Sequence, residues 1–156
     1  MASVTIQVAT PDDWSAWRDV RLAALAESPD AFASTLGDWV HADEQRWRAR
    51  LESVPCNVLA FEDGRPVGQA SGTELDAARR VELISLWMAP DARGAGTADA
   101  LVAAVVDHGR SVGAVAVQSA VRAANGPARA FYRKGGCAPG DEPADAPDEL
   151  MMRLDL

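Results

Sequence analysis

Residues Val81 to Ala98 read VELISLWMAPDARGAGTA, and they hold the pattern that decides the fold. An apolar run ends at Pro90, a short polar turn follows, and a glycine-rich turn begins at Arg93. After it, apolar residues recur at the spacing of one helix face, at Ala98, Leu101, Val102, Val105 and Val106. The predicted order is a strand, a glycine-rich turn and a helix. Such a junction presents backbone N–H groups at a helix N-terminus, where they can bind an anion.

The turn itself has the residue types that a phosphate-binding loop needs. Gly94 and Gly96 remove side chains where a ligand approaches the backbone, and both can adopt a positive φ. Arg93 can offer a fixed fork of donors to a phosphate. No Lys-Ser/Thr pair follows the glycines and only two glycines are present, which excludes a P-loop and a dinucleotide-binding GxGxxG. We expect a pyrophosphate here rather than a plain strand–helix connection, held by Arg93, Gly94, Ala95, Gly96, Thr97 and Ala98.

Length and composition indicate one ordinary globular domain. The chain has 156 residues, of which 48% are hydrophobic and 24% are charged, enough for a single substantial core. The formal net charge of −8 disfavours nucleic acid as a partner, because its phosphates would be repelled. An acidic surface is compatible with a cationic amine substrate, although most such surfaces only confer solubility.

The sequence has no pattern typical of secretion, membrane insertion or metal binding. Residues 1–14 contain no basic segment followed by a long apolar core, so we expect no signal peptide, and no apolar run is long enough to cross a bilayer. We interpret Cys56 and Cys137 as reduced core thiols of a cytoplasmic protein. His41 and His108 lack the spacing of zinc ligands, so no metal is expected.

Periodicity and turn residues along the chain predict an α+β fold in a single domain over residues 1–156. Thr10 and Pro11 have the residue types of a helix start, and Asp63-Gly64 is a hairpin signal. The strand–helix–strand order after residue 81 makes its two strands parallel neighbours in a mixed, largely antiparallel sheet with helices on both faces. The predicted strands are 3–9, 57–61, 67–73, 81–88, 114–121 and 150–156, the helices 11–28, 43–53, 97–110 and 128–134, and a proline-rich loop covers 139–147.

Two segments resemble the GNAT family of acetyl-coenzyme A-dependent N-acetyltransferases. Residues 86–98, LWMAPDARGAGTA, contain Arg-x-x-Gly-x-Ala, and residues 125–137, NGPARAFYRKGGC, are similar to the family's Asn-x-x-Ala-x-x-Phe-Tyr-x-Lys-x-Gly-Phe segment. Cys137 departs from the aromatic residue that the family has there. The resemblance is strong over residues 81–137. It implies a three-layer α/β/α fold and acetyl-CoA as the co-substrate that donates the acetyl group.

The resemblance also implies how the coenzyme lies. In the family, a bulge splays the strand before the turn from the next strand and leaves a V-shaped gap for the pantetheine arm. Trp87 and Met88 would bind pantetheine through their backbone atoms. Asn125 caps the following helix and, by resemblance, sits beside the pantetheine arm.

Tyr132, the single tyrosine of the chain, is the candidate general acid. By resemblance its hydroxyl points toward the thioester, where it can protonate the leaving thiolate, while Phe131 packs into the core. The alternative is a tyrosine that packs by its ring and hydrogen-bonds only for structure.

Glu82 is the candidate general base, because an amine arrives protonated and must lose a proton before it attacks. Strict alternation places it on one strand face with Ile84, Leu86 and Met88, where partial desolvation would make it a stronger base. The alternative is a solvated glutamate paired with Arg79 or Arg80, with a water chain as the base.

The acceptor is the part of the reaction that the residues leave open. A small-molecule or peptide amine fits, and an acidic cluster near the C-terminus is either part of its pocket or solvated loop, namely Asp141, Glu142, Asp145, Asp148 and Glu149. Four tryptophans could line an acceptor pocket, but their helical spacing predicts that most are core or interface residues: Trp14, Trp17, Trp39 and Trp47. Homodimers are common in the family, but no pattern here marks a dimer interface. An acyl-CoA-binding regulator without turnover, or an interaction module on the same fold, are the alternatives to an enzyme.

Overall fold

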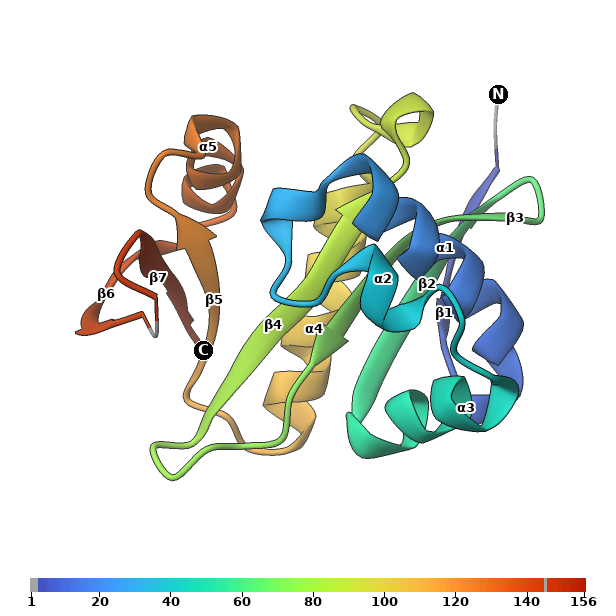
Figure 1. Ribbon diagram of the computed structural model, residues 1–156. Helices are drawn as coiled ribbons and strands as arrows, with labels where there is room; N and C mark the ends of the chain where they lie inside the picture. Colours follow the sequence, from blue (N-terminus) through green and yellow to red (C-terminus); the bar gives the residue numbers. More distant parts are fainter. Residues whose placement is uncertain (1–2, 145) are drawn as a thin grey trace.

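The computed structural model describes residues 3–144 and 146–156 (Figure 1). Within these residues one seven-stranded sheet forms, in the order β1-β2-β3-β4-β5-β7-β6. Among the strand pairs of the described residues, only β4–β5 is parallel. The strands are β1 (Val4–Val8), β2 (Cys56–Glu62), β3 (Arg65–Gly72), β4 (Arg80–Met88), β5 (Ala116–Arg122), β6 (Ala138–Pro143) and β7 (Glu149–Asp155). The expected α+β class, with a mixed and mostly antiparallel sheet, is confirmed.

Helices cover both faces of the sheet, which gives the expected three layers. In Figure 1, α4 lies behind the strands, α1 to α3 lie in front, and α5 lies beside one end of β5. The helices are α1 (Trp14–Glu27), α2 (Leu36–Trp39), α3 (Glu44–Ser53), α4 (Thr97–Ser111) and α5 (Gly126–Lys134). Short 3₁₀ turns connect these elements. Pro11–Asp13 leads into α1, Pro29–Ala31 lies between α1 and α2, and Pro90–Ala92 lies between β4 and α4.

Two hydrophobic cores hold the layers together. Between the sheet and α4, Leu101 and Val105 pack against Val81 and Leu83. Between the sheet and α1 and α3, three large side chains are buried together: Trp17, Trp47 and Trp87. At about 25 cal/mol per Å² of buried apolar surface, side chains of this size are the main stabilising contribution of that layer.

The local signals read from the sequence are mostly confirmed. Asp63 and Gly64 have φ of 51° and 83°, which is the pair of positive values that a type I′ hairpin between β2 and β3 requires. Thr10 and Asp13 form a capping box on the 3₁₀ turn that leads into α1. Among the described residues, no helix is long and apolar enough to cross a membrane.

The expected loop at 139–147 is wrong over its first half, because Ala138–Pro143 is strand β6. It pairs with β7 at the edge of the sheet, through Ala138 with Arg153 and Pro139 with Met152. An edge strand tolerates prolines, since one side of it needs no N–H donor for the ladder. Proline content alone therefore misassigned this segment.

Strands β4 and β5 separate soon after they begin. Their register covers Arg80 to Glu82, paired with Ala116 to Gln118, and does not extend further along β4. On the other side of β4, the β3–β4 register shifts where Ser85 has a φ of 58°. A non-glycine residue in this region is uncommon and marks a bulge. The bulge and the splayed parallel pair that the resemblance implies are both present.

The bulge also corrects which residues share a strand face with Glu82. Strict alternation would put Met88 on that face, but Met88 packs with Val81 and Leu83 in the core under α4. Trp87 instead joins the core on the α1 side. One extra residue at Ser85 shifts the side-chain alternation by one position. The residues after it therefore lie on the face opposite to the one that strict alternation predicts.

Candidate active site

The glycine-rich turn ends in the N-terminus of α4. Gly96 is the N-cap of this helix with a φ of 80°, and Gly94 has a φ of 87°. A Cβ built on either glycine would meet no atom within 4 Å, so the space in front of the turn is open. Within the described residues, the N–H groups of residues 94–99 find no protein acceptor. These unpaired donors at the positive end of a helix dipole form a cradle that fits a pyrophosphate.

The side chain of Arg93 is turned toward α1. Its Nη2 lies 3.3 Å from each carboxylate oxygen of Glu27, and its Nε donates to the carbonyl of Met88 at 3.1 Å. The guanidinium is thus engaged within the protein through Nε and Nη2, and its role in holding a phosphate stays a prediction. Arg93 ties the turn to the end of β4.

Glu27, at the end of α1, is the second half of this tie. Its carboxylate also accepts a hydrogen bond from Trp87 Nε1 at 2.9 Å and one from Ser28. Hydrogen bonds from Ser28, Trp87 and Arg93 lower the pKa of Glu27, which keeps it ionised. Together Glu27, Trp87 and Arg93 tie the turn and the end of β4 to α1, which lies far away in sequence.

Tyr132 lies on α5 with its hydroxyl directed into the splay between β4 and β5. The hydroxyl donates to Ser119 Oγ of β5 at 3.3 Å, and Ser119 donates to the carbonyl of Leu83 of β4 at 3.0 Å. Burial raises the pKa of Tyr132, although the hydrogen bond to Ser119 opposes the rise. A raised pKa keeps the phenol protonated at neutral pH, as a proton donor must be.

The roles expected for Phe131 and Tyr132 are partly exchanged. Tyr132 is only 8% exposed and belongs to the core under α4, whereas Phe131 is partly buried and packs against that core. The two rings meet edge to face with centroids 5.3 Å apart. On a short helix such as α5, two consecutive residues face different directions, one into the core and one toward its margin. The sequence pattern did not show which of Phe131 and Tyr132 would be the buried one.

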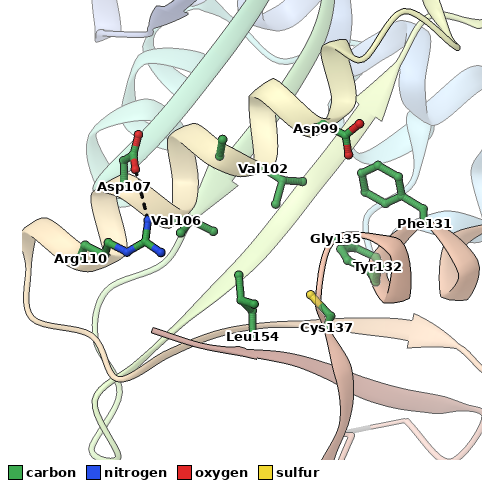
Figure 2. Close-up of a pocket in the computed structure, with 11 residues that line it drawn as sticks. Asp99, Val102, Val106, Asp107, Arg110, Phe131, Tyr132, Gly135, Cys137 and Leu154 are labelled. Atoms are coloured by element: carbon green, nitrogen blue, oxygen red, sulfur yellow. Dashed lines mark ion pairs between the residues drawn. The ribbon is translucent and has the colours of Figure 1, made fainter.

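Two cavities meet at these rings. The larger, about 810 Å³, lies on the α1 side of the splay and is lined by β4, β5 and the segment after α1. The smaller, about 310 Å³, lies between α4 and α5 and reaches Cys137 and Leu154, as Figure 2 shows. Phe131 and Tyr132 line both. The Tyr132 hydroxyl therefore lies where a ligand passing between the strands would meet a second ligand from the α1 side.

The other predicted site residues lie around the same splay. Glu82 and Asn125 line the larger cavity, Glu82 half-buried at the last paired position of β4. Asn125 is the N-cap of α5, as expected, and its Oδ1 accepts from the N–H of Ala128 at 3.1 Å. Trp87 and Met88 stand at the end of β4, where β3 pairs with them and β5 does not.

The pairing of Glu82 with Arg79 or Arg80 stays a prediction, and both arginines also contact other groups. Arg80 forms an ion pair with Asp76 at 2.8 Å, and Arg79 donates to the carbonyl of Gly113 at 2.7 Å.

Part of the acidic cluster falls outside what the structure describes, namely Asp145 and the side chains of Asp141 and Glu142. Asp148 forms an ion pair with Arg122 at 2.6 Å, and Glu149 lines the larger cavity. Of the four tryptophans, Trp17 and Trp47 are core residues, as expected.

Sequence reasoning missed two residues that position the site. Ser119 completes the buried face of β5 between Val117 and Val121, and a lone polar residue in that alternation is the signal that could have found it. Glu27 had no such signal, because its partners Trp87 and Arg93 lie at least 60 residues away.

Comparison with known proteins places the chain in a family. The model of the acetyltransferase (GNAT) family matches residues 17–136. The chain belongs to the GNAT family. It is therefore an acyltransferase by family, as the two motif segments indicated. A comparison with curated proteins found no match.

Solved acetyltransferase structures share this fold over nearly the whole chain. The PaiA N-acetyltransferase of Thermoplasma acidophilum, in complex with coenzyme A, is 14% identical with a TM-score of 0.77 and 99% of each chain covered. The ribosomal-protein-alanine N-acetyltransferase of Brucella melitensis is 21% identical with a TM-score of 0.76, covering 97% of this chain and 99% of that one. The yncA protein of Salmonella typhimurium, with its cofactor acetyl-CoA, is 18% identical with a TM-score of 0.74, covering 98% and 94%.

Proposed function

We propose that this GNAT protein transfers the acetyl group of acetyl-CoA to a primary amine by direct attack in a ternary complex. The observation that carries the proposal is the placement of the Tyr132 hydroxyl in the splay between β4 and β5, within the lining of both cavities. A donor reaching the splay from the turn at 93–98 and an acceptor in the larger cavity would meet beside a protonated phenol.

The residues around the turn fit acetyl-CoA as donor. The unpaired N–H groups of residues 94–99 would hold its pyrophosphate, with Gly94 and Gly96 leaving the approach open. The part of β4 that β5 does not pair, through Trp87 and Met88, would supply peptide groups to the pantetheine amides, and Asn125 would lie beside that arm. Similar structures hold coenzyme A or acetyl-CoA, which supports the same donor here.

The chemistry assigns one proton donor and one proton acceptor. Glu82, directly or through water, takes one proton from the ammonium so that the nitrogen can attack the thioester carbonyl. The new bond joins nitrogen to the acetyl carbon, and the carbon–sulfur bond breaks. Tyr132 gives its proton to the departing sulfur. The attacking nitrogen then loses a second proton as the amide forms, and this proton returns the Tyr132 phenolate to a phenol. Glu82 then releases its proton to solvent, and the products are the N-acetyl amine and free coenzyme A.

An amine acceptor is supported by similar structures that are named ribosomal-protein-alanine N-acetyltransferases. The test of function is calorimetric titration with acetyl-CoA, followed by a thiol-release screen against an amine library. Binding with acetyl-dependent thiol release is the expected result. Binding without release from any amine would leave the acyl-CoA-binding regulator, and no binding at high coenzyme concentration would remove both.

Glu82→Gln tests the base. If Glu82 removes the proton, its protonation sets the acidic limb of the kcat/KM profile, because activity is lost when the base is already protonated. We expect the variant to lower kcat/KM by about 10-fold at neutral pH and to shift that limb. Glu149→Gln, which changes the other glutamate of the same cavity, should leave the profile in place. A wild-type profile for Glu82→Gln would identify water as the base.

A further inference from the structure

The larger cavity is basic, although the chain as a whole is acidic. Among the described residues that line it are four arginines, Arg21, Arg50, Arg80 and Arg122, and two glutamates, Glu82 and Glu149. The net charge of the chain is −8. An acidic exterior therefore says little about the charge of the ligand that this cavity takes, and the local charges point the other way.

Two of these arginines are compensated by nearby carboxylates. Arg80 pairs with Asp76 at 2.8 Å and Arg122 with Asp148 at 2.6 Å. Arg21 and Arg50 differ. Among the described residues no carboxylate pairs with either, and the one charge that acts on Arg21 is that of Arg50. The walls of the cavity thus hold two neighbouring positive charges without a negative partner.

Arg21 is held in place by packing rather than by hydrogen bonds. Its guanidinium lies 4.6 Å from the ring centroid of Phe32, and its buried Nη1 has no hydrogen-bond partner in the described chain. Burial, with a contribution from the charge of Arg50, lowers the pKa of Arg21 to about 10, so it remains charged at neutral pH. An unpaired donor of this kind costs free energy unless a ligand satisfies it.

Arg50 is oriented by neutral groups. It donates to Asn57 Oδ1 at 3.0 Å and to Ser71 Oγ at 3.2 Å, and its guanidinium stands 5.3 Å from the ring centroid of Trp17. Burial lowers its pKa. These contacts fix the direction of the side chain and leave its charge uncompensated. Such an arrangement is typical of an arginine that receives a ligand's anionic group.

We propose that Arg21 and Arg50 form a carboxylate subsite, so that the acceptor is a small amine bearing a free carboxylate, of the amino-acid class. This inference rests on the proposed function, since it names the acceptor for the same cavity. A carboxylate offers two oxygens to two guanidinium groups and would supply the missing negative charge. A polyamine would add positive charge beside both arginines. A protein N-terminus would present a neutral amide there and leave the arginines unpaired.

The test compares amino acids with their carboxamides, which keep the amine and lose the negative charge. Thiol release with acetyl-CoA should show kcat/KM about 10- to 100-fold higher for the acid than for the amide. Calorimetry with the N-acetylated acid and its amide, in the presence of coenzyme A, measures the same preference without turnover. Equal values, or a preference for the amide, would overturn the subsite. Absence of thiol release with every amine would overturn the proposed function instead, while the calorimetric preference still decides the subsite.

Variants assign the preference to residues. Arg21→Met and Arg50→Met should each remove most of the preference for the acid while acetyl-CoA affinity stays unchanged, and Arg50→Lys should restore part of it. Arg18→Met and Arg48→Met change arginines on the same two helices whose ion pairs lie outside the cavity, and should keep the preference. If Arg21→Met and Arg50→Met bind acetyl-CoA and retain the wild-type acid preference, the assignment is wrong. The ratio of acid to amide is measured within one variant, so a loss of stability cannot imitate it.

Discussion

Replacing Gly96 with leucine is expected to abolish acetyl-CoA binding while the protein stays folded. The glycine has a φ of 80° and caps α4, and a Cβ there would project into open space, not into the core. A leucine side chain would therefore cover the unpaired N–H groups of residues 94–99. Hydrogen bonds to a charged phosphate are among the strongest in proteins, so we expect the dissociation constant to rise by at least about 100-fold. Calorimetry with acetyl-CoA measures it.

Gly64→Leu is the matched control for the backbone cost. Gly64 has a φ of 83° in the β2–β3 hairpin, and a Cβ there also meets no atom within 4 Å. Both variants should lose about 1–2 kcal/mol of stability, because leucine is strained in the left-handed region. Only Gly96→Leu should lose the coenzyme. Retained affinity in Gly96→Leu would remove the pyrophosphate from this turn.

The sequence predicted the parts of this molecule that depend on local chemistry. The Asp63-Gly64 hairpin and the Asn125 cap of α5 are determined by neighbouring residues, and both were confirmed. The parallel pairing of β4 and β5 follows from connection rules that apply to any strand–helix–strand unit. Most of the fold could therefore be predicted without a structure.

The remainder depends on contacts between distant segments. The bulge at Ser85 adds one residue to β4, and nothing in the apolar run marks that residue, so the faces of Met88 and Trp87 were exchanged. Whether Ala138–Pro143 becomes a strand depends on a free edge at β7. No sequence pattern marks Arg21 and Arg50, because only the packed structure shows that, among the described residues, no carboxylate pairs with them.

Tyr132→Phe is expected to have the largest effect on turnover. The substitution keeps the buried ring and its edge-to-face contact with Phe131, and removes only the hydroxyl bonded to Ser119. Loss of a general acid lowers kcat by about 100-fold or more. Because burial raises the pKa of Tyr132, the wild-type phenol is protonated at neutral pH, and the loss should be constant from about pH 6 to 9. Acetyl-CoA affinity should change little, since no donor to the pyrophosphate is removed.

Ser119→Ala separates the chemical role of this hydroxyl from a structural one. Ser119 joins Tyr132 to the Leu83 carbonyl, so its removal breaks the hydrogen bond that orients the phenol but leaves the proton donor in place. If Tyr132 is the general acid, Ser119→Ala should lower kcat far less than Tyr132→Phe does. If the hydroxyl serves only structure, both variants should lose about 1 kcal/mol of unfolding free energy and keep wild-type kcat. Steady-state thiol release and chemical denaturation of the same two variants distinguish these outcomes, because a proton donor moves kcat and a structural hydrogen bond moves stability.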